Sequence, residues 1–137
     1  MKFKRILCGV DFSEYSVKAF KTAVDLARLF KADLHVIHVI EANPAIPEDA
    51  LTLEEKAITA LNALVTQWGT TLDKDQVTTE VTTGRASTEI INSARIREVD
   101  LTVLGAKGVT LLEEVFIGGT MEHVLKEAPC SVLAVRN

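Results

Sequence analysis

The sequence predicts an α/β domain over residues 1–137, built on an open five-stranded parallel sheet with helices on both faces. Two observations carry this prediction. Five short apolar segments rich in β-branched residues alternate with stretches of helical periodicity, the pattern of repeated strand–helix–strand units. The length of 137 residues and the 47% hydrophobic composition suit a single domain with a full core.

The apolar segments are the expected strands, and helical periods fill the intervals between them. We expect strands at 6–10, 34–40, 77–82, 101–104 and 131–135. Ser13 caps the first helix, the second covers about 48–72, the third about 87–97, and Pro129 stops the fourth. The apolar residues at helical spacing are Phe20, Ala23, Val24, Ala27 and Phe30, then Ala57, Leu61, Leu64 and Trp68, then Ile90, Ile91 and Ala94, and last Met121, Val124, Leu125 and Ala128.

The order of the strands follows from their polarity. The third segment, VTTEVT, alternates apolar and polar residues, so we place it at an edge, and the more uniformly apolar first, second and fourth strands are central. The order 3-2-1-4-5 satisfies these constraints and reverses the winding between strands one and four. Ligands of open α/β sheets bind outside the carboxyl ends of the strands at such a reversal. We therefore expect the ligand-binding site in the segments that follow Val10 and Leu104.

A glycine-rich stretch follows the fourth strand. Gly105 and Gly108 allow a close approach of the backbone to a ligand, and Gly118, Gly119 and Thr120 lie at the start of the last helix, where free N–H groups attract anions. The pattern indicates a phosphate cradle. The alternative is that these glycines only form turns and that Thr120 only caps a helix.

The spacing of these glycines resembles the nucleotide-binding motif of the universal stress protein family: Gly, two residues, Gly, nine residues, then Gly and Ser or Thr. The resemblance extends over the whole chain, from KRILCGVDFSEYSVKAFKTAVDLA at the start to EHVLKEAPCSVLAVR at the end. It implies the Rossmann-like fold of that family, with the strand order 3-2-1-4-5. It also implies binding of an adenine nucleotide, ATP, accompanied by Mg²⁺.

One position departs from the motif. Gly119 stands where the family has Ser or Thr, and Thr120 follows one place later. Two interpretations are open: Thr120 supplies the hydroxyl, or the phosphates contact backbone N–H groups alone. The loss of one neutral hydrogen bond costs about 0.5–1.5 kcal/mol, which weakens binding without abolishing it.

The resemblance places Asp11 near the adenine, where its carboxylate accepts a hydrogen bond from the base or the ribose. Asp11 also suits a cap of the first helix, and the two roles are compatible. Lys107 is either a phosphate contact or a solvated lysine. The complete set of expected nucleotide-binding residues is Gly9, Val10, Asp11, Val39, Leu104, Gly105, Lys107, Gly108, Gly118, Gly119 and Thr120.

Three functions are weighed. The favoured one is a stress-response regulator that binds an adenine nucleotide. The alternative is a relative that has lost nucleotide binding and acts as a dimeric interaction module, which Gly119 favours. An enzyme is disfavoured, since the chain has no Walker lysine motif and no motif of the ATP pyrophosphatases or nucleotidyl transferases. Slow ATP hydrolysis is the most activity we expect, and no catalytic residue is assigned.

The remaining expectations concern partners and location. The last strand is an apolar edge, so we expect a homodimer through Val132, Leu133, Ala134 and Val135, as the resemblance also implies. The net charge of −4 without a basic stripe argues against nucleic-acid binding. The apolar run before Asp11 is too short for a signal peptide and no stretch is long enough to span a membrane, so we expect a cytoplasmic protein. We also expect two reduced cysteines and no metal cluster.

Overall fold

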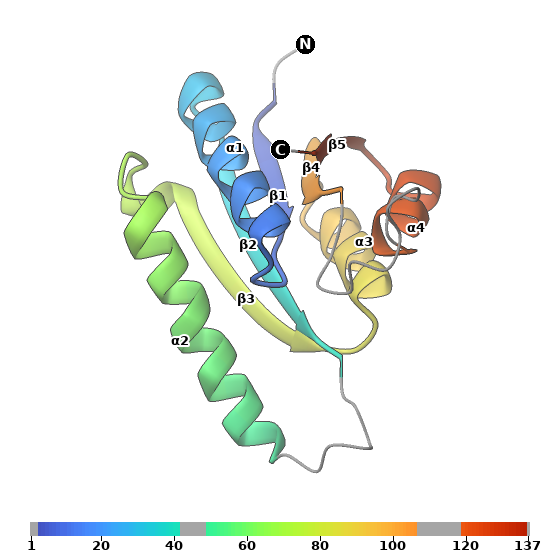
Figure 1. Ribbon diagram of the computed structural model, residues 1–137. Helices are drawn as coiled ribbons and strands as arrows, with labels where there is room; N and C mark the ends of the chain where they lie inside the picture. Colours follow the sequence, from blue (N-terminus) through green and yellow to red (C-terminus); the bar gives the residue numbers. More distant parts are fainter. Residues whose placement is uncertain (1–2, 42–48, 107–118, 137) are drawn as a thin grey trace.

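The computed structural model describes residues 3–41, 49–106 and 119–136. Five parallel strands form a sheet in the order β3-β2-β1-β4-β5, as the sequence predicts (Figure 1). The elements in chain order are β1 (Arg5–Gly9), α1 (Glu14–Phe30), β2 (Asp33–Ile40), α2 (Ala50–Trp68), the short 3-10 helix η1 (Lys74–Gln76), β3 (Val77–Thr83), α3 (Ala86–Ile96), β4 (Leu101–Gly105), α4 (Gly119–Glu127) and β5 (Ser131–Val135).

The helices cover both faces of the sheet. Figure 1 shows α1 and α2 on one side and α3 and α4 on the other. Each side has its own apolar core, because alternate residues of a strand point to opposite faces. Phe20 of α1 and Leu61 of α2 belong to one core, and Ile90 of α3 and Met121 of α4 belong to the other.

The edge position of β3 explains its sequence. Its residues are partly or fully exposed, whereas most residues of β1 and β4 are buried. A strand with one unpaired edge and one wet face needs fewer apolar side chains than a central strand. The alternation in this segment therefore located the edge of the sheet correctly.

Helix α2 is shorter than the predicted range of about 48–72. The side chain of Asp49 accepts a hydrogen bond from the Leu51 N–H and fixes the start, so the expected beginning at Glu48 lies just outside the described residues. Gly69 ends the helix at its other end. Leu72 is still buried, which explains why apolar periodicity continues past the helix.

Two residues of the predicted apolar stripes are not core residues. Trp68 is 39% exposed, and the Nζ atom of Lys21 lies 3.5 Å from the centre of its ring. This is a cation–π contact between α1 and α2 at the surface. Leu125 is 48% exposed on α4, whereas Met121 and Val124 are buried. None of the helices within the described residues is both long and apolar enough to cross a membrane.

Candidate functional site

The winding of the sheet reverses between β1 and β4, which are neighbours. They pair in parallel from Ile6 with Leu101 to Cys8 with Val103. The chain leaves β1 toward α1 on one face, and it leaves β4 toward α4 on the other face. The chain therefore diverges to opposite faces after these two strands, at the edge of the sheet where α1, α3 and α4 begin.

Asp11 forms the turn between β1 and α1. Its Oδ1 atom accepts a hydrogen bond of 2.9 Å from the Ser13 N–H, and Ser13 Oγ accepts one of 3.2 Å from the Ser16 N–H. Between them, Phe12 has a φ angle of 65°, a left-handed conformation that is uncommon for a bulky residue. The capping role expected of Asp11 and Ser13 is thus present. Oδ1 takes the bond from Ser13, and Oδ2 of the same carboxylate is an acceptor that a ligand could use.

Val10 is held from both sides. Its N–H donates to the Ile37 carbonyl at 2.9 Å, and its carbonyl accepts a hydrogen bond of 2.7 Å from the His38 ring. Because a carbonyl only accepts, Nδ1 of His38 carries the proton. The ring of Phe12 packs on that of His38, with 4.6 Å between their centres. The imidazole therefore stabilises the backbone that places Asp11 at the strand end.

Gly9 and Leu104 pack against each other. A Cβ atom on Gly9 would lie 2.8 Å from Leu104 Cδ2 and 2.9 Å from Ile90 Cδ1. Leu104 is 5% exposed. At these two positions the side chains build the core beneath the ends of β1 and β4, which leaves their backbone atoms as the groups that a ligand could contact.

Gly105 is required by the packing of α1. A Cβ atom there would lie 2.8 Å from the Tyr15 carbonyl carbon, 2.9 Å from its oxygen and 3.1 Å from the Ser16 nitrogen. These are backbone atoms that cannot rotate away. The absent side chain thus lets the first turn of α1 approach the end of β4, which is a structural reason for this glycine separate from the expected close approach of a ligand.

Of the remaining residues expected in the glycine-rich stretch, the structure describes Gly119 and Thr120. Gly119 is the first residue of α4, and among the described residues no atom lies within 4 Å of where its Cβ would be. Thr120 follows in the same turn and is half-buried. The expected contacts at Lys107, Gly108 and Gly118 lie outside the described residues.

Two further contacts tie the elements around this edge together. Val39 lies near the end of β2, half-buried against the core of α3 and α4. Just beyond it, the Glu41 carboxylate accepts a hydrogen bond of 2.8 Å from the Ala86 N–H at the start of α3. Nδ1 of His123 on α4 lies 2.6 Å from Ser87 Oγ on α3. Sequence patterns did not predict these contacts, because each joins residues 36 or more positions apart.

Within the described residues, the cysteines and acidic residues form neither a disulfide nor a metal site. Cys8 is fully buried and burial raises the pKa of its thiol, so it stays protonated. Cys130 lies 3.3 Å from Thr102 Oγ1, and both cysteines are free, as expected. In the described parts of the chain, no three His, Cys, Asp or Glu residues come together as a metal site would require.

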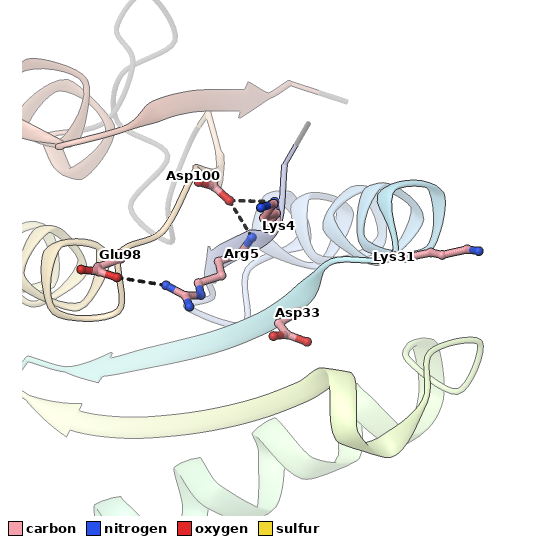
Figure 2. A pocket seen from close by; sticks show the side chains of 6 residues that line it. All are labelled: Lys4, Arg5, Lys31, Asp33, Glu98 and Asp100. Carbon is pink, nitrogen blue, oxygen red and sulfur yellow. Dashed lines mark hydrogen bonds and ion pairs between the residues drawn. The ribbon is translucent and has the colours of Figure 1, made fainter. Parts of the chain in front are cut away.

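A polar cavity of about 540 Å³ lies at the opposite, amino-terminal end of the strands. Figure 2 shows how its side chains are used: Oδ2 of Asp100 accepts hydrogen bonds from the backbone N–H groups of Lys4 and Arg5, at 2.7 and 2.8 Å, and Arg5 pairs with Glu98 at 3.2 Å. These contacts hold the starts of β1 and β4 together. The cavity is far from the winding reversal and is a structural feature of the sheet.

The model of the universal stress protein family matches residues 2–136. The chain belongs to this family. A universal stress protein of Methanocaldococcus jannaschii, MJ0531, is 30% identical over 145 residues, covering 98% of this chain and 82% of its own length. The universal stress protein YxiE of Bacillus subtilis is 28% identical, covering 98% and 99%.

Solved structures of universal stress proteins share the whole architecture. The universal stress protein UspA from Lactobacillus plantarum superposes with a TM-score of 0.83 at 30% identity, over 99% of both chains. The Rossmann-like sheet and its winding reversal are thus those of the universal stress protein family.

Proposed function

We propose that this universal stress protein is a cytoplasmic regulator that binds an adenine nucleotide, ATP, between the carboxyl ends of β1 and β4. The observation that carries the proposal is the conjunction of Asp11 at the end of β1 with the glycine motif after β4, at the winding reversal of the sheet. The carboxylate faces the base or ribose, and the N–H groups at the start of α4 face the phosphates.

Proteins of the same fold support the class of ligand. One universal stress protein was solved in complex with cAMP, and superposes with a TM-score of 0.73 at 18% identity. Another, from Archaeoglobus fulgidus, was solved in complex with dAMP, with a TM-score of 0.71 at 14% identity. At such low identity the likeness shows the fold alone, so the nucleotide is the ligand of those two proteins and a proposal for this one.

Mg²⁺ would enter with the triphosphate. The ion prefers oxygen ligands and commonly keeps several waters while it bridges phosphates, so it needs few protein ligands. The absence of an acidic cluster among residues 3–41, 49–106 and 119–136 is compatible with that mode of binding.

The nucleotide content of the purified protein tests the proposal. We expect denaturation to release an adenine nucleotide that chromatography identifies, and the emptied, refolded protein to take up ATP again in calorimetry. Adenosine and GTP are the comparison ligands for base and phosphate recognition. An empty preparation that takes up no ATP at millimolar concentration would instead favour the interaction-module alternative. Phosphate release from bound ATP then measures any hydrolysis.

A serine at position 119 is expected to strengthen ATP binding. Gly119→Ser adds the hydroxyl that the family motif carries, in a place where no described atom obstructs it. One added neutral hydrogen bond is worth about 0.5–1.5 kcal/mol, so the Kd should fall by up to about tenfold. Gly119→Ala is the matched control, since it adds the Cβ without the hydroxyl. Equal affinities of the two variants would show that this position does not contact phosphate.

We also propose that two copies pair through β5. This strand is the edge of the sheet opposite β3, and its residues are half-buried or exposed, Leu133 at 36%. An apolar edge with unpaired N–H and C=O groups readily pairs with a second strand. The contact residues would be Val132, Leu133, Ala134 and Val135.

A lysine at this edge is expected to separate the two copies. Leu133→Lys places a charge on each side of the proposed interface, so sedimentation at micromolar concentration should show the monomer mass for the variant and twice that mass for the natural protein. Leu125→Lys is the control, because Leu125 is also exposed but lies on α4. A natural protein that sediments as a monomer contradicts the proposed dimer.

A further inference from the structure

Helices α3 and α4 begin at the same edge of the sheet, where we propose that the nucleotide binds. α3 starts at Ala86, directly after β3, and α4 starts at Gly119, and both helices lie on the same face (Figure 1). Their apolar sides share one core, to which Ile90 of α3 and Met121 of α4 belong. The position of one helix start therefore depends on the position of the other.

A hydrogen bond joins the two helices near their starts. Nδ1 of His123, on α4, lies 2.6 Å from Oγ of Ser87, the second residue of α3. Ser87 is only 2% exposed, and a hydrogen bond shielded from water is stronger than one at the surface. A hydroxyl can donate as well as accept, so the contact forms with either tautomer of the imidazole.

This bond acts on the first turn of α4. His123 follows Gly119 by four residues, about one helical turn, and the side chains of a helix lean toward its N-terminus. The ring therefore lies beside the turn that contains Gly119 and Thr120. Residues at the two sides of the bond come from helices that the core alone would leave free to slide and rotate slightly past one another.

The start of α3 is itself fixed to β2. The Glu41 carboxylate accepts a hydrogen bond of 2.8 Å from the Ala86 N–H, and the Gly84 N–H donates to the Ile40 carbonyl at 3.0 Å. Ile40 is the last residue of β2. Polar contacts thus run from the end of β2 through the start of α3 to the first turn of α4.

The N–H groups in the first turn of a helix have no partner within the helix, and they are the groups that would face the phosphates. Because they all point along the helix axis, a small rotation of α4 changes the direction of all of them together. Hydrogen bonds weaken steeply when the donor is poorly aligned. The affinity for phosphates should therefore depend on the orientation of α4, whereas the base and ribose are expected at the ends of β1 and β2.

We propose that Ser87 and His123 are positioning residues for the phosphates of the nucleotide: their hydrogen bond holds the first turn of α4 where its N–H groups meet the phosphate oxygens. This inference rests on the proposed ATP site and adds to it two residues that contact no ligand. Without the bond, α4 adopts other orientations as well, and the affinity falls in proportion to the fraction of molecules in the binding orientation. The strength of one neutral hydrogen bond limits that fall to about tenfold.

Calorimetry with ATP and with adenosine tests the positioning role. We expect Ser87→Ala to weaken ATP binding about threefold to tenfold and to leave adenosine binding unchanged, because adenosine has no phosphates. Ser93→Ala is the matched control, since it removes the hydroxyl of another buried serine of α3, one that lies 3.5 Å from Glu80 of β3. An equal loss of affinity for both ligands in S87A would show general damage to the site and would overturn the proposal.

Variants of His123 distinguish positioning from direct contact. His123→Asn keeps a hydrogen-bonding group near the place of Nδ1, and His123→Leu has none. We expect H123N to bind ATP nearly as the natural protein does, and H123L to bind it as weakly as S87A. The double variant S87A/H123L should be no weaker than either single variant, because the same bond is lost only once. If H123N loses affinity for ATP while S87A keeps it, His123 itself contacts the phosphates and the positioning role is wrong.

Hydrogen exchange measures the hold on α4 without a ligand. In S87A, the amides of α4 should exchange several-fold faster than in the natural protein, after correction for the intrinsic rate, and those of α1 should not change. Unchanged exchange in α4 contradicts the proposal, and H123L gives the same comparison if S87A does not fold. If the natural protein takes up no ATP, the proposed function is wrong and the role of the pair at the phosphates is wrong with it. If the natural protein and S87A bind ATP equally well, the proposed function stands and only the positioning role is wrong.

Discussion

Replacing Gly105 with alanine is expected to lower the free energy of unfolding by about 1–3 kcal/mol, the usual cost of adding a methyl group where there is no space. The new Cβ would lie 2.8 Å from the Tyr15 carbonyl carbon and 3.1 Å from the Ser16 nitrogen. Neither atom can move alone, because both belong to the first turn of α1, which the Ser13 cap and the core under Phe20 hold in place. The variant must shift the helix or the end of β4.

Urea unfolding followed by circular dichroism measures this effect. Gly119→Ala is the control, since it makes the same chemical change at a glycine where no described atom lies within 4 Å of the new Cβ. We expect G119A to unfold at nearly the same urea concentration as the natural protein. If G105A is as stable as G119A, the close approach of α1 to β4 is not the reason for a glycine at position 105.

The arrangement of the sheet could be predicted because the signals were local. The alternation of residues 77–82 marked the edge, and five apolar segments with helical intervals fixed the parallel order. The end of α2 was misplaced, since apolar periodicity continues beyond Gly69 to Leu72, and Trp68 and Leu125 were wrongly placed in the apolar stripes.

The candidate site was predictable to a smaller extent. The turn at Asp11 and the cap at Ser13 are contacts within a few residues, which a sequence pattern can encode. The reason for Gly105 is a helix turn some ninety positions away in the chain, and the pattern alone indicated only a ligand. The same limit applies to the bond between Ser87 and His123, because two residues on different helices meet only after the helices have packed.

Replacing Asp11 with asparagine is expected to weaken adenosine and ATP binding by about tenfold to a hundredfold, the range for losing a hydrogen bond to a charged group, about 1.5–3 kcal/mol. The fold should survive this change, because the asparagine Oδ1 atom can still accept the hydrogen bond from the Ser13 N–H. Calorimetry with both ligands measures the affinities. Asp25→Asn on the surface of α1 is the control for a general change in charge.

Two ligands are needed because the carboxylate of Asp11 acts in two opposing ways. It accepts a hydrogen bond from the base or ribose, and it also repels the triphosphate, so D11N loses the first effect and relieves the second. Beyond about 8 Å the repulsion is largely screened at physiological salt, and the hydrogen bond should dominate. Adenosine has no phosphates and reports on the hydrogen bond alone. If D11N binds adenosine as the natural protein does and ATP more tightly, Asp11 acts only through its charge, and the adenine or ribose contact assigned to it is wrong.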